Sequence, residues 1–528
     1  MKNYYPLSKT EEGIYVSCLE KTDAYNLPNL INLGKDIDIL RFKEAVIKVF
    51  DAHPYLFTVL FEGEDGKIYK KIKTKRINIP CHTVEKIDIK PTYFKMLDGH
   101  LFELEFFKCH EEYYFYFNFH HIIFDGTSIN LFINEVFQAY EGKNIDLENY
   151  DANKFAQDEE KMLSSKKYDA AKNYFEELIK DTEVDSTPVY DKSEQDISYK
   201  NYNAQLEITN EEVKKYTSKH NLKTSSYFLG AFAFLLTKIN MDDKALFLTV
   251  NNGRNKDLKH SLGMFVKTYP MYVENKDTVL EYLNEVNDEQ IESVKNLLYP
   301  FSDLLKDLDI NAKIIFAYQG DYFYKGELKG KELFATPLER KDGKELLSIE
   351  LHRDNGKFNI WIEYRNDLYE ESTITHLIKL YDQVLKEFLV KEKLDDVNLV
   401  SDEEAKLLDS FNQTDLSYID FDKTILDYFK ESVKKYPKNI AVNYNEKEYT
   451  YQSVDLISNK IANKLIELGI KKEHVVSILI LKSEYIVLAS LGVIKSGGAY
   501  QPLDPTYPQE RKERCWWTNH WWLWNPSC

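Results

Sequence analysis

Residues 119–128 read Phe-His-His-Ile-Ile-Phe-Asp-Gly-Thr-Ser, and they end an aromatic run that is typical of a β-strand. Successive side chains of a strand point to opposite faces, so His120 and His121 are not expected to face the same cavity. One imidazole is therefore predicted to be structural, and the other is available for acid–base chemistry on an amine or an alcohol. Asp125-Gly126 predicts a turn directly after the strand.

A helix is predicted after this turn, and Thr127 or Ser128 is placed to cap it. Its apolar residues recur at helical spacing: Ile129, Phe132, Val136 and Tyr140. A histidine pair near such a junction is more often structural than catalytic. The Asp-Gly pair that follows favours the catalytic interpretation without excluding the structural one.

The pattern His-His-x-x-x-Asp-Gly over residues 120–126 resembles the core motif of the condensation domains of nonribosomal peptide synthetases. These domains are members of the chloramphenicol-acetyltransferase-like acyltransferases. Other segments resemble the family in the same order along the chain: Tyr5–Ser8 with Glu12–Tyr15, His53–Thr58, Asn252–Arg254 with Leu262–Val266, and more loosely Tyr299–Phe301 and Ile315–Gln319. The segment at His53 departs from the family, because Ala52 and Phe57 stand where arginines are usual. The resemblance covers roughly residues 4–395.

The resemblance implies an α/β (α+β) fold of two chloramphenicol-acetyltransferase-like lobes arranged in a V. The active site is then expected in a tunnel between the lobes. His121 is implied to be the catalytic residue, which takes a proton from the attacking amine or orients that amine. His120 is implied to shape the strand, and Asp125 to pair with Arg254 of the other lobe. Gly126 is implied to leave room for a substrate arm.

The implied reaction joins two thioesters that are carried on the 4′-phosphopantetheine arms of donor and acceptor peptidyl carrier proteins. The amine of the acceptor attacks the donor thioester and gives an amide and a thiol. No tightly bound cofactor and no metal are expected. Two alternatives stay open, an inactive or gatekeeping module that only docks carriers and an acyltransferase that uses acyl-coenzyme A. Whether the module would initiate or elongate a peptide also stays open.

Composition limits the partners further. The 528 residues carry a net charge of −18, which argues against a nucleic acid or an anionic membrane as the main partner. Five cysteines are too few for a disulfide framework and lack the spacing of metal ligands. The chain begins without the apolar segment of a signal peptide, and Lys482 and Glu484 interrupt the apolar stretch 475–494. We therefore expect a cytoplasmic monomer without a membrane span.

The sequence changes character after Ser401. Residues 494–511 resemble the beginning of an adenylation domain, the amino-acid-activating enzyme of the adenylate-forming (acyl-CoA synthetase-like) class. The Ser/Thr/Gly-rich loop that would cradle ATP phosphates does not follow, so adenylation activity is expected to be absent. Five of the six tryptophans lie in the last 13 residues, which predicts a foreign or out-of-frame tail on a truncated domain.

The expected division of the chain has five parts. A condensation-domain N-lobe spans 1–178, and a C-lobe spans 179–396. A linker spans 397–422, a partial adenylation domain 423–511, and an atypical Trp-rich tail 512–528.

Overall fold

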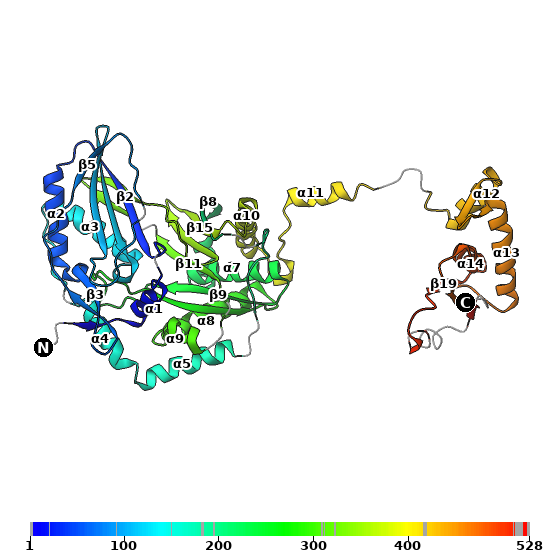
Figure 1. Ribbon diagram of the computed structural model, residues 1–528, viewed down its shortest axis with the longest axis horizontal. Helices are drawn as coiled ribbons and strands as arrows, with labels where there is room; N and C mark the ends of the chain where they lie inside the picture. The colour runs from blue at the N-terminus through cyan, green and yellow to red at the C-terminus, as the bar shows by residue number, and fades with distance from the viewer. Residues whose placement is uncertain are drawn as a thin grey trace. The chain divides into compact units, whose positions relative to one another are not determined.

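The computed structural model describes residues 4–20, 22–90, 92–148, 150–180, 184–193, 196–307, 310, 312–321, 324–414, 420–510 and 512, together with the backbone of 521–524. The chain divides into two compact units, Met1–Glu404 and Ala405–Cys528. The larger unit has two lobes, each built on a six-stranded sheet (Figure 1). The expected two-lobed α/β (α+β) fold is confirmed.

The sheet of the first lobe has the strand order β12-β13-β2-β7-β6-β5. Its strands are β2 (Asn26–Gly34), β5 (Cys81–Val84), β6 (Phe102–Cys109), β7 (Glu112–His120), β12 (Lys325–Leu328) and β13 (Lys331–Pro337). Helices α2 (Ile39–Ala52) and α3 (Gly126–Tyr140) cover one face, and the buried phenylalanines of β7 pack into the same core. The aromatic run is thus the strand that its composition predicts.

A smaller sheet, β1-β4-β3, completes the first lobe. It is formed by β1 (Tyr5–Pro6), β3 (Thr58–Glu62) and β4 (Ile68–Ile72). Helix α1 (Lys9–Ser17) follows β1 and contacts the 3₁₀ turn η2 (His121–Ile123) that succeeds β7. A second 3₁₀ turn, η1 (Pro54–Phe57), leads into β3. The opening segment of the chain therefore lies against the histidine motif.

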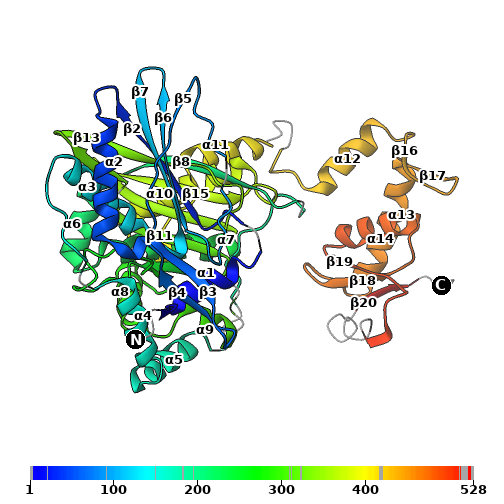
Figure 2. The same ribbon diagram turned by 60° about the vertical axis from the view of Figure 1, so that its left-hand side comes forward.

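The sheet of the second lobe has the order β10-β9-β11-β14-β15-β8 (Figure 2). Its strands are β8 (Tyr199–Thr209), β9 (Lys244–Asn251), β10 (Lys267–Glu274), β11 (Ile314–Asp321), β14 (Leu347–Asp354) and β15 (Lys357–Arg365). Helices α7 (Thr224–Asn240), α8 (Val279–Lys295) and α10 (Glu371–Phe388) bury their apolar residues against it. The remaining helices of this unit are α4 (Ala152–Met162), α5 (Lys166–Ile179), α6 (Asn210–His220) and α9 (Phe301–Asp307), with the short turn η3 (Leu394–Asp396).

One hairpin crosses between the lobes, and the sequence pattern did not predict it. Strands β12 and β13 follow β11 of the second lobe, yet β13 pairs antiparallel with β2, with Ala335 opposite Ile31. Gly326 of β12 packs on α3, where an added Cβ would lie 2.9 Å from both Ile133 and Phe137. The hairpin therefore ties the second half of the unit to the sheet that carries the histidines.

The smaller unit contains α12 (Ile425–Lys435), the hairpin β16 (Ile440–Tyr444) and β17 (Lys447–Thr450), and α13 (Tyr451–Glu467). Strand β18 (Val475–Leu479), helix α14 (Glu484–Lys495) and strand β19 (Ala499–Leu503) form a parallel βαβ unit. Strand β20 (Trp521–Trp524) also pairs parallel with β18, while Trp516 and Trp517 of the Trp-rich tail lie outside the described residues. Helix α11 (Asp402–Phe411) lies at the division between the two units.

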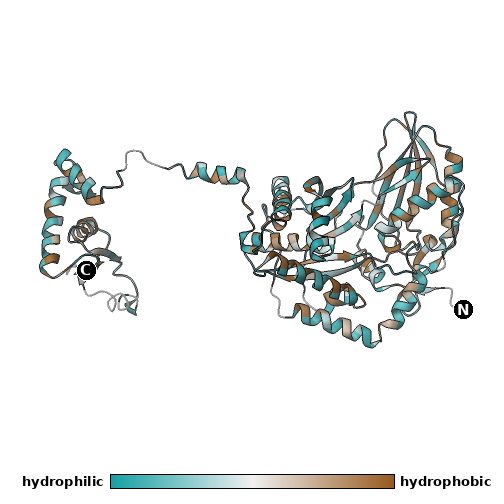
Figure 3. Ribbon diagram, turned by 180° about the vertical axis from the view of Figure 1, so that it is seen from behind, coloured by the Kyte–Doolittle hydropathy of each residue, from teal (hydrophilic) through white to brown (hydrophobic). Residues whose placement is uncertain are grey.

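Apolar and polar residues alternate around the helices of both units (Figure 3). This amphipathic pattern is expected of helices that cover a sheet on one side and meet water on the other. In the described part of the chain, no helix has the length and apolarity needed to cross a bilayer.

Candidate functional site

The two histidines lie on opposite sides of an element boundary. His120 is the last residue of β7, and His121 begins η2. The His120 amide donates to the Leu101 carbonyl at 2.9 Å, and the His121 amide donates to the Tyr25 carbonyl at 2.7 Å. Both positions are therefore fixed through the backbone before any side chain contributes.

His120 is buried, with 2% of its surface exposed. Its Nδ1 accepts a hydrogen bond from the Ile122 amide at 3.2 Å, so the neutral ring carries its proton on Nε2. Nε2 lies 3.7 Å from Sγ of Cys18. Burial, with a further contribution from the charge of Lys344, lowers the pKa of His120 to about 3. These contacts suit a neutral ring that supports the strand.

His121 is only half-buried, and its Nδ1 has no hydrogen-bond partner among the described residues. Burial lowers the His121 pKa well below its usual value, and the positive charge of Lys344 is the next cause. The ring is therefore neutral near pH 7, the form that accepts a proton from an amine. The two imidazoles differ in environment, but His121 lies in η2 rather than in the strand, so the alternation of side chains along a strand does not account for the difference.

Asp125, the aspartate of the motif, directly precedes helix α3. Its backbone is extended (φ −125°, ψ 177°), and its carboxylate accepts from the Ser128 amide at 2.8 Å. Asp125 is thus the N-cap of α3, and the prediction that Thr127 or Ser128 fills this role was wrong. Gly126, predicted as part of a turn, is the first helical residue and is half-buried. An aspartate in extended backbone reaches the third amide of a helix as readily as serine or threonine does.

The structure brings Arg254 to Asp125 across 129 residues of sequence. Arg254 Nη2 lies 2.8 Å from Asp125 Oδ1, and the two side chains are 5% and 0% exposed. Arg254 Nη2 also donates to Ser128 Oγ at 2.9 Å, and Asp125 Oδ2 accepts from the Phe265 amide at 3.1 Å. The ion pair therefore connects the N-terminus of α3 to the segment that leads into β10.

Gly253 allows the backbone to present Arg254 in this way. Its φ is 63°, a left-handed conformation that favours glycine. A Cβ at this position would lie 1.8 Å from the Phe265 carbonyl oxygen. Arg254 itself also donates from Nη1 to the carbonyls of Leu258 at 2.9 Å and Ser261 at 2.5 Å.

His53, from the second family-like segment, is buried between two carboxylates. Its Nε2 lies 2.6 Å from Glu135 of α3, and its Nδ1 lies 3.4 Å from Glu148. Burial acts to lower the His53 pKa, but hydrogen bonds and charges of Glu135 and Glu148 raise it to about 9. Glu148 also accepts from the Leu262 amide at 3.0 Å, so this charged cluster supports the segment beside Asp125.

We expect the stabilisation from His53 to depend on pH. Its folded pKa of about 9 exceeds the unfolded value of about 6.5, so the contribution is complete below the unfolded pKa and is lost as pH rises through the folded one. Urea unfolding of wild type and His53→Gln should therefore show a difference in unfolding free energy that shrinks between about pH 6 and about pH 10. His82→Gln, at a side chain 48% exposed, is the matched control. A difference for His53→Gln that stays constant with pH would contradict the charged state assigned to His53.

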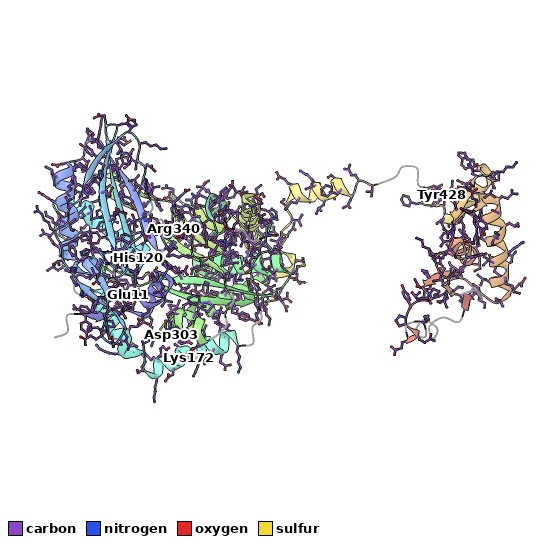
Figure 4. The ribbon with its side chains drawn as sticks, in the orientation of Figure 1. Glu11, His120, Lys172, Asp303, Arg340 and Tyr428 are labelled. Atoms are coloured by element: carbon purple, nitrogen blue, oxygen red, sulfur yellow. The ribbon has the colours of Figure 1, made fainter. Side chains whose placement is uncertain are left out.

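Sequence reasoning missed the charged residues that the second lobe brings to this site. Arg340 Nη1 donates to the Ala24 carbonyl at 2.8 Å, next to the Tyr25 residue that holds His121. Lys344 Nζ lies 4.3 Å from the centroid of the Tyr25 ring. Both residues are in the segment between β13 and β14, which has no periodicity or motif that could have revealed them. Figure 4 marks Arg340 and His120 where the two lobes meet.

Comparison with known proteins matches most of this chain to one family and a later part to a second family. The family described as Condensation domain matches residues 1–408, and the family described as AMP-binding enzyme matches residues 429–516. Bacitracin synthase 3 of Bacillus licheniformis is 26% identical over 541 residues, which cover 97% of this chain and 8% of that protein. Gramicidin S synthase 2 of Brevibacillus brevis is 26% identical over 550 residues, 97% of this chain and 12% of that protein. The chain thus spans only a small part of the length of these curated relatives.

Solved structures agree on the fold. A four-domain nonribosomal peptide synthetase bound to AMP and glycine matches 98% of this chain and 43% of that chain, with a TM-score of 0.70 and 17% identity. The starter condensation domain of rhizomide synthetase matches 75% of this chain and 100% of that chain, with a TM-score of 0.64 and 13% identity. At these identities the likeness concerns the fold alone. Among the described residues, no group of His, Cys, Asp or Glu is arranged to hold a metal ion.

Proposed function

The chain belongs to the condensation-domain family of nonribosomal peptide synthetases, and from this membership we propose that it forms an amide bond between a carrier-bound thioester donor and the amine of a carrier-bound aminoacyl acceptor. The observation that supports this most directly is the state of His121. Its ring is neutral and half-buried, and its backbone amide is held by the Tyr25 carbonyl at the end of β7. The turn beside it is fixed by the buried pair of Asp125 and Arg254.

The chemistry assigned to His121 is proton transfer and orientation. The acceptor nitrogen attacks the donor thioester carbon, a C–N bond forms, and the C–S bond breaks. The neutral imidazole accepts the proton that the nitrogen loses and returns it to the departing thiolate, so that an amide and a thiol result. Positioned acid–base help of this kind contributes typically about 10²–10⁴ in rate, and holding both tethered substrates together contributes as well.

The roles of the surrounding residues follow from this proposal. His120 keeps the strand end rigid through its bond from the Ile122 amide. Asp125 and Arg254 keep the turn in place, and Gly126 at the start of α3 adds no side chain beside the site. No tightly bound cofactor is proposed, since the substrates arrive on the 4′-phosphopantetheine arms of donor and acceptor carrier proteins.

Intact mass spectrometry of the acceptor carrier tests the proposal. Purified chain is incubated with an aminoacyl-loaded acceptor carrier and one of three donors: an aminoacyl carrier, a fatty-acyl carrier or a fatty acyl-coenzyme A. We expect the acceptor mass to increase by the acyl group of one donor class, which also identifies the module as initiating or elongating. If no donor produces an increase, the chain is a docking or gatekeeping module and the catalytic proposal fails.

We further propose the domain boundaries expected from the sequence, and that residues 423–511 taken by themselves do not activate an amino acid. Residues 429–528 contain no Ser/Thr/Gly-rich loop whose amides would hold ATP phosphates. Amino-acid-dependent exchange of pyrophosphate into ATP should therefore stay at the level of a no-enzyme control across the proteinogenic amino acids. Exchange above this level with any amino acid would contradict the proposal.

The proposed state of the protein is a cytoplasmic monomer that acts on carrier proteins rather than on nucleic acid. The net charge of −18 and the free thiols of Cys18, Cys81 and Cys109 support this assignment. Light scattering of the purified chain would give the mass of a single 62.3 kDa chain if it is correct.

A further inference from the structure

The segment between β13 and β14 is fastened to the turn before β2. The carboxylate of Asp342 accepts from Thr22 Oγ1 at 2.9 Å and from the Asp23 amide at 3.0 Å. In return, the carboxylate of Asp23 accepts from the amides of Lys341 at 3.1 Å and Asp342 at 2.8 Å. These four hydrogen bonds hold the segment in a fixed position beside Tyr25.

Lys344 lies directly beside the residue that holds the histidine pair. Its Nζ is 4.3 Å from the centroid of the Tyr25 ring. The carbonyl of the same tyrosine accepts a hydrogen bond from the His121 amide at 2.7 Å, and its ring stacks with the His120 ring at 6.4 Å between centroids. Lys344 is therefore placed beside Tyr25, from where its charge acts on both imidazoles.

The charge of Lys344 is not neutralised by a direct partner. Arg340 pairs with Glu363 at 2.8 Å, but Lys344 has no carboxylate within ion-pair distance among the described residues. Burial lowers the Lys344 pKa to about 8, and Arg340 acts in the same direction, whereas Glu363, Glu345 and Glu350 oppose both. Lys344 thus remains mostly charged near pH 7.

We propose that Lys344 is a positioning residue whose unpaired positive charge acts together with burial to hold His121 in its neutral, proton-accepting form. The proposal rests on the proposed function, since neutrality matters only if His121 accepts a proton. A cation near an imidazole disfavours the imidazolium form. Besides Lys344, the charged or titratable groups that act on His121 are Arg340 and His120. Arg340 is offset by Glu363, and His120 is neutral, so the net field comes mainly from Lys344.

Burial is the larger cause of the lowered His121 pKa, and the charge of Lys344 adds to it. The effect of burial depends on how much water the site holds. The charge on Lys344 persists whether or not a substrate excludes that water. It disappears only when pH rises above the Lys344 pKa of about 8, where His121 is neutral in any case.

The pH dependence of amide formation tests this role. We expect Lys344→Met to match wild type at about pH 8.5 and at neutral pH, and to lose activity relative to wild type only at acidic pH, by up to about tenfold for each pH unit below the raised His121 pKa. Lys344→Arg, which keeps the charge, should follow wild type at every pH. The matched control is Lys341→Met, the same change at an exposed side chain in the same segment. A loss of activity for Lys344→Met that is the same at every pH would overturn the proposal, because a merely structural role predicts that result.

A second measurement does not depend on catalysis. In protein labelled at histidine ¹³Cε1, His121→Gln identifies the His121 signal among the 12 histidines. We expect this signal to titrate at a higher pH in Lys344→Met than in wild type, and to be unchanged in Tyr25→Leu, which removes the ring contact but keeps the carbonyl and the charge. An unchanged His121 titration in Lys344→Met would refute the proposal even in an active enzyme. If the titration shifts but no donor gives product, the proposed function fails while the electrostatic role of Lys344 stands.

Discussion

Replacing His121 with alanine is expected to lower the rate of amide formation by about 10²–10⁴, the usual contribution of a positioned acid–base group. The change removes a neutral, half-buried imidazole at the end of β7. The fold should be preserved, because His121 is held through its backbone amide, which alanine retains. Residual activity is expected from the two tethered substrates that remain side by side. Single-turnover measurements with loaded carriers give the rate directly.

His82→Ala provides the matched control for this experiment. His82 lies on β5, and its side chain is 48% exposed and 3.7 Å from Glu105. Its removal should leave the rate unchanged. If His121→Ala forms product as fast as His82→Ala, with the same thermal unfolding temperature, the chemistry does not depend on His121. A lower rate with a lowered unfolding temperature would instead indicate damage to the fold, which His121→Gln would then separate from catalysis.

Replacing Arg254 with methionine is expected to cost about 3–5 kcal/mol of unfolding free energy, because Asp125 is then left buried without its partner. The carboxylate is fully buried and loses the hydrogen bond from Arg254 Nη2, while Ser128 Oγ loses its own contact to the guanidinium. The large expected cost reflects the unpaired charge rather than the net value of the pair. Urea unfolding of the larger unit measures it, and activity should fall as the turn next to His121 shifts.

The double variant Asp125→Asn with Arg254→Met separates these contributions. Asparagine keeps an oxygen that accepts from the Ser128 amide, so α3 retains its cap. Without either charge, the double variant should be less destabilised than the sum of the two single changes. Lys161→Met, which breaks an ion pair with side chains 73% and 51% exposed, should cost only about 0–1 kcal/mol. An Arg254→Met cost equal to that of Lys161→Met would show that the pair does not brace the site.

Local periodicity predicted the elements that are continuous in sequence. The aromatic run became β7, and the apolar residues at helical spacing from Ile129 to Tyr140 became the buried side of α3. In each case the pattern of buried side chains repeats with the period of the element that buries them. The separation of His120 from His121 was expected from strand alternation, but it arises where β7 ends and η2 begins.

The remaining parts of the site depend on contacts that periodicity does not encode. The cap of α3 was assigned to the wrong residue, because serine, threonine and aspartate are all suitable caps and all three occur between Asp125 and Ser128. The crossing hairpin at 325–337 pairs with β2 although the two segments are far apart in the sequence, and local propensity carries no information on such pairing. Lys344 reaches Tyr25, the residue beside the histidines, in the same way, through a segment without secondary structure. The pairing of Asp125 with Arg254 came from the family resemblance rather than from spacing.

We propose above that this chain transfers an acyl group to the nitrogen of a carrier-bound acceptor through His121. Tandem mass spectrometry of the acceptor arm after incubation with one loaded donor tests it most directly. With wild type we expect an acceptor whose amine carries the donor acyl group, and with His121→Ala almost none of this product at the same time point. Equal amounts of this product with both proteins, or none with wild type for every donor class, would contradict it.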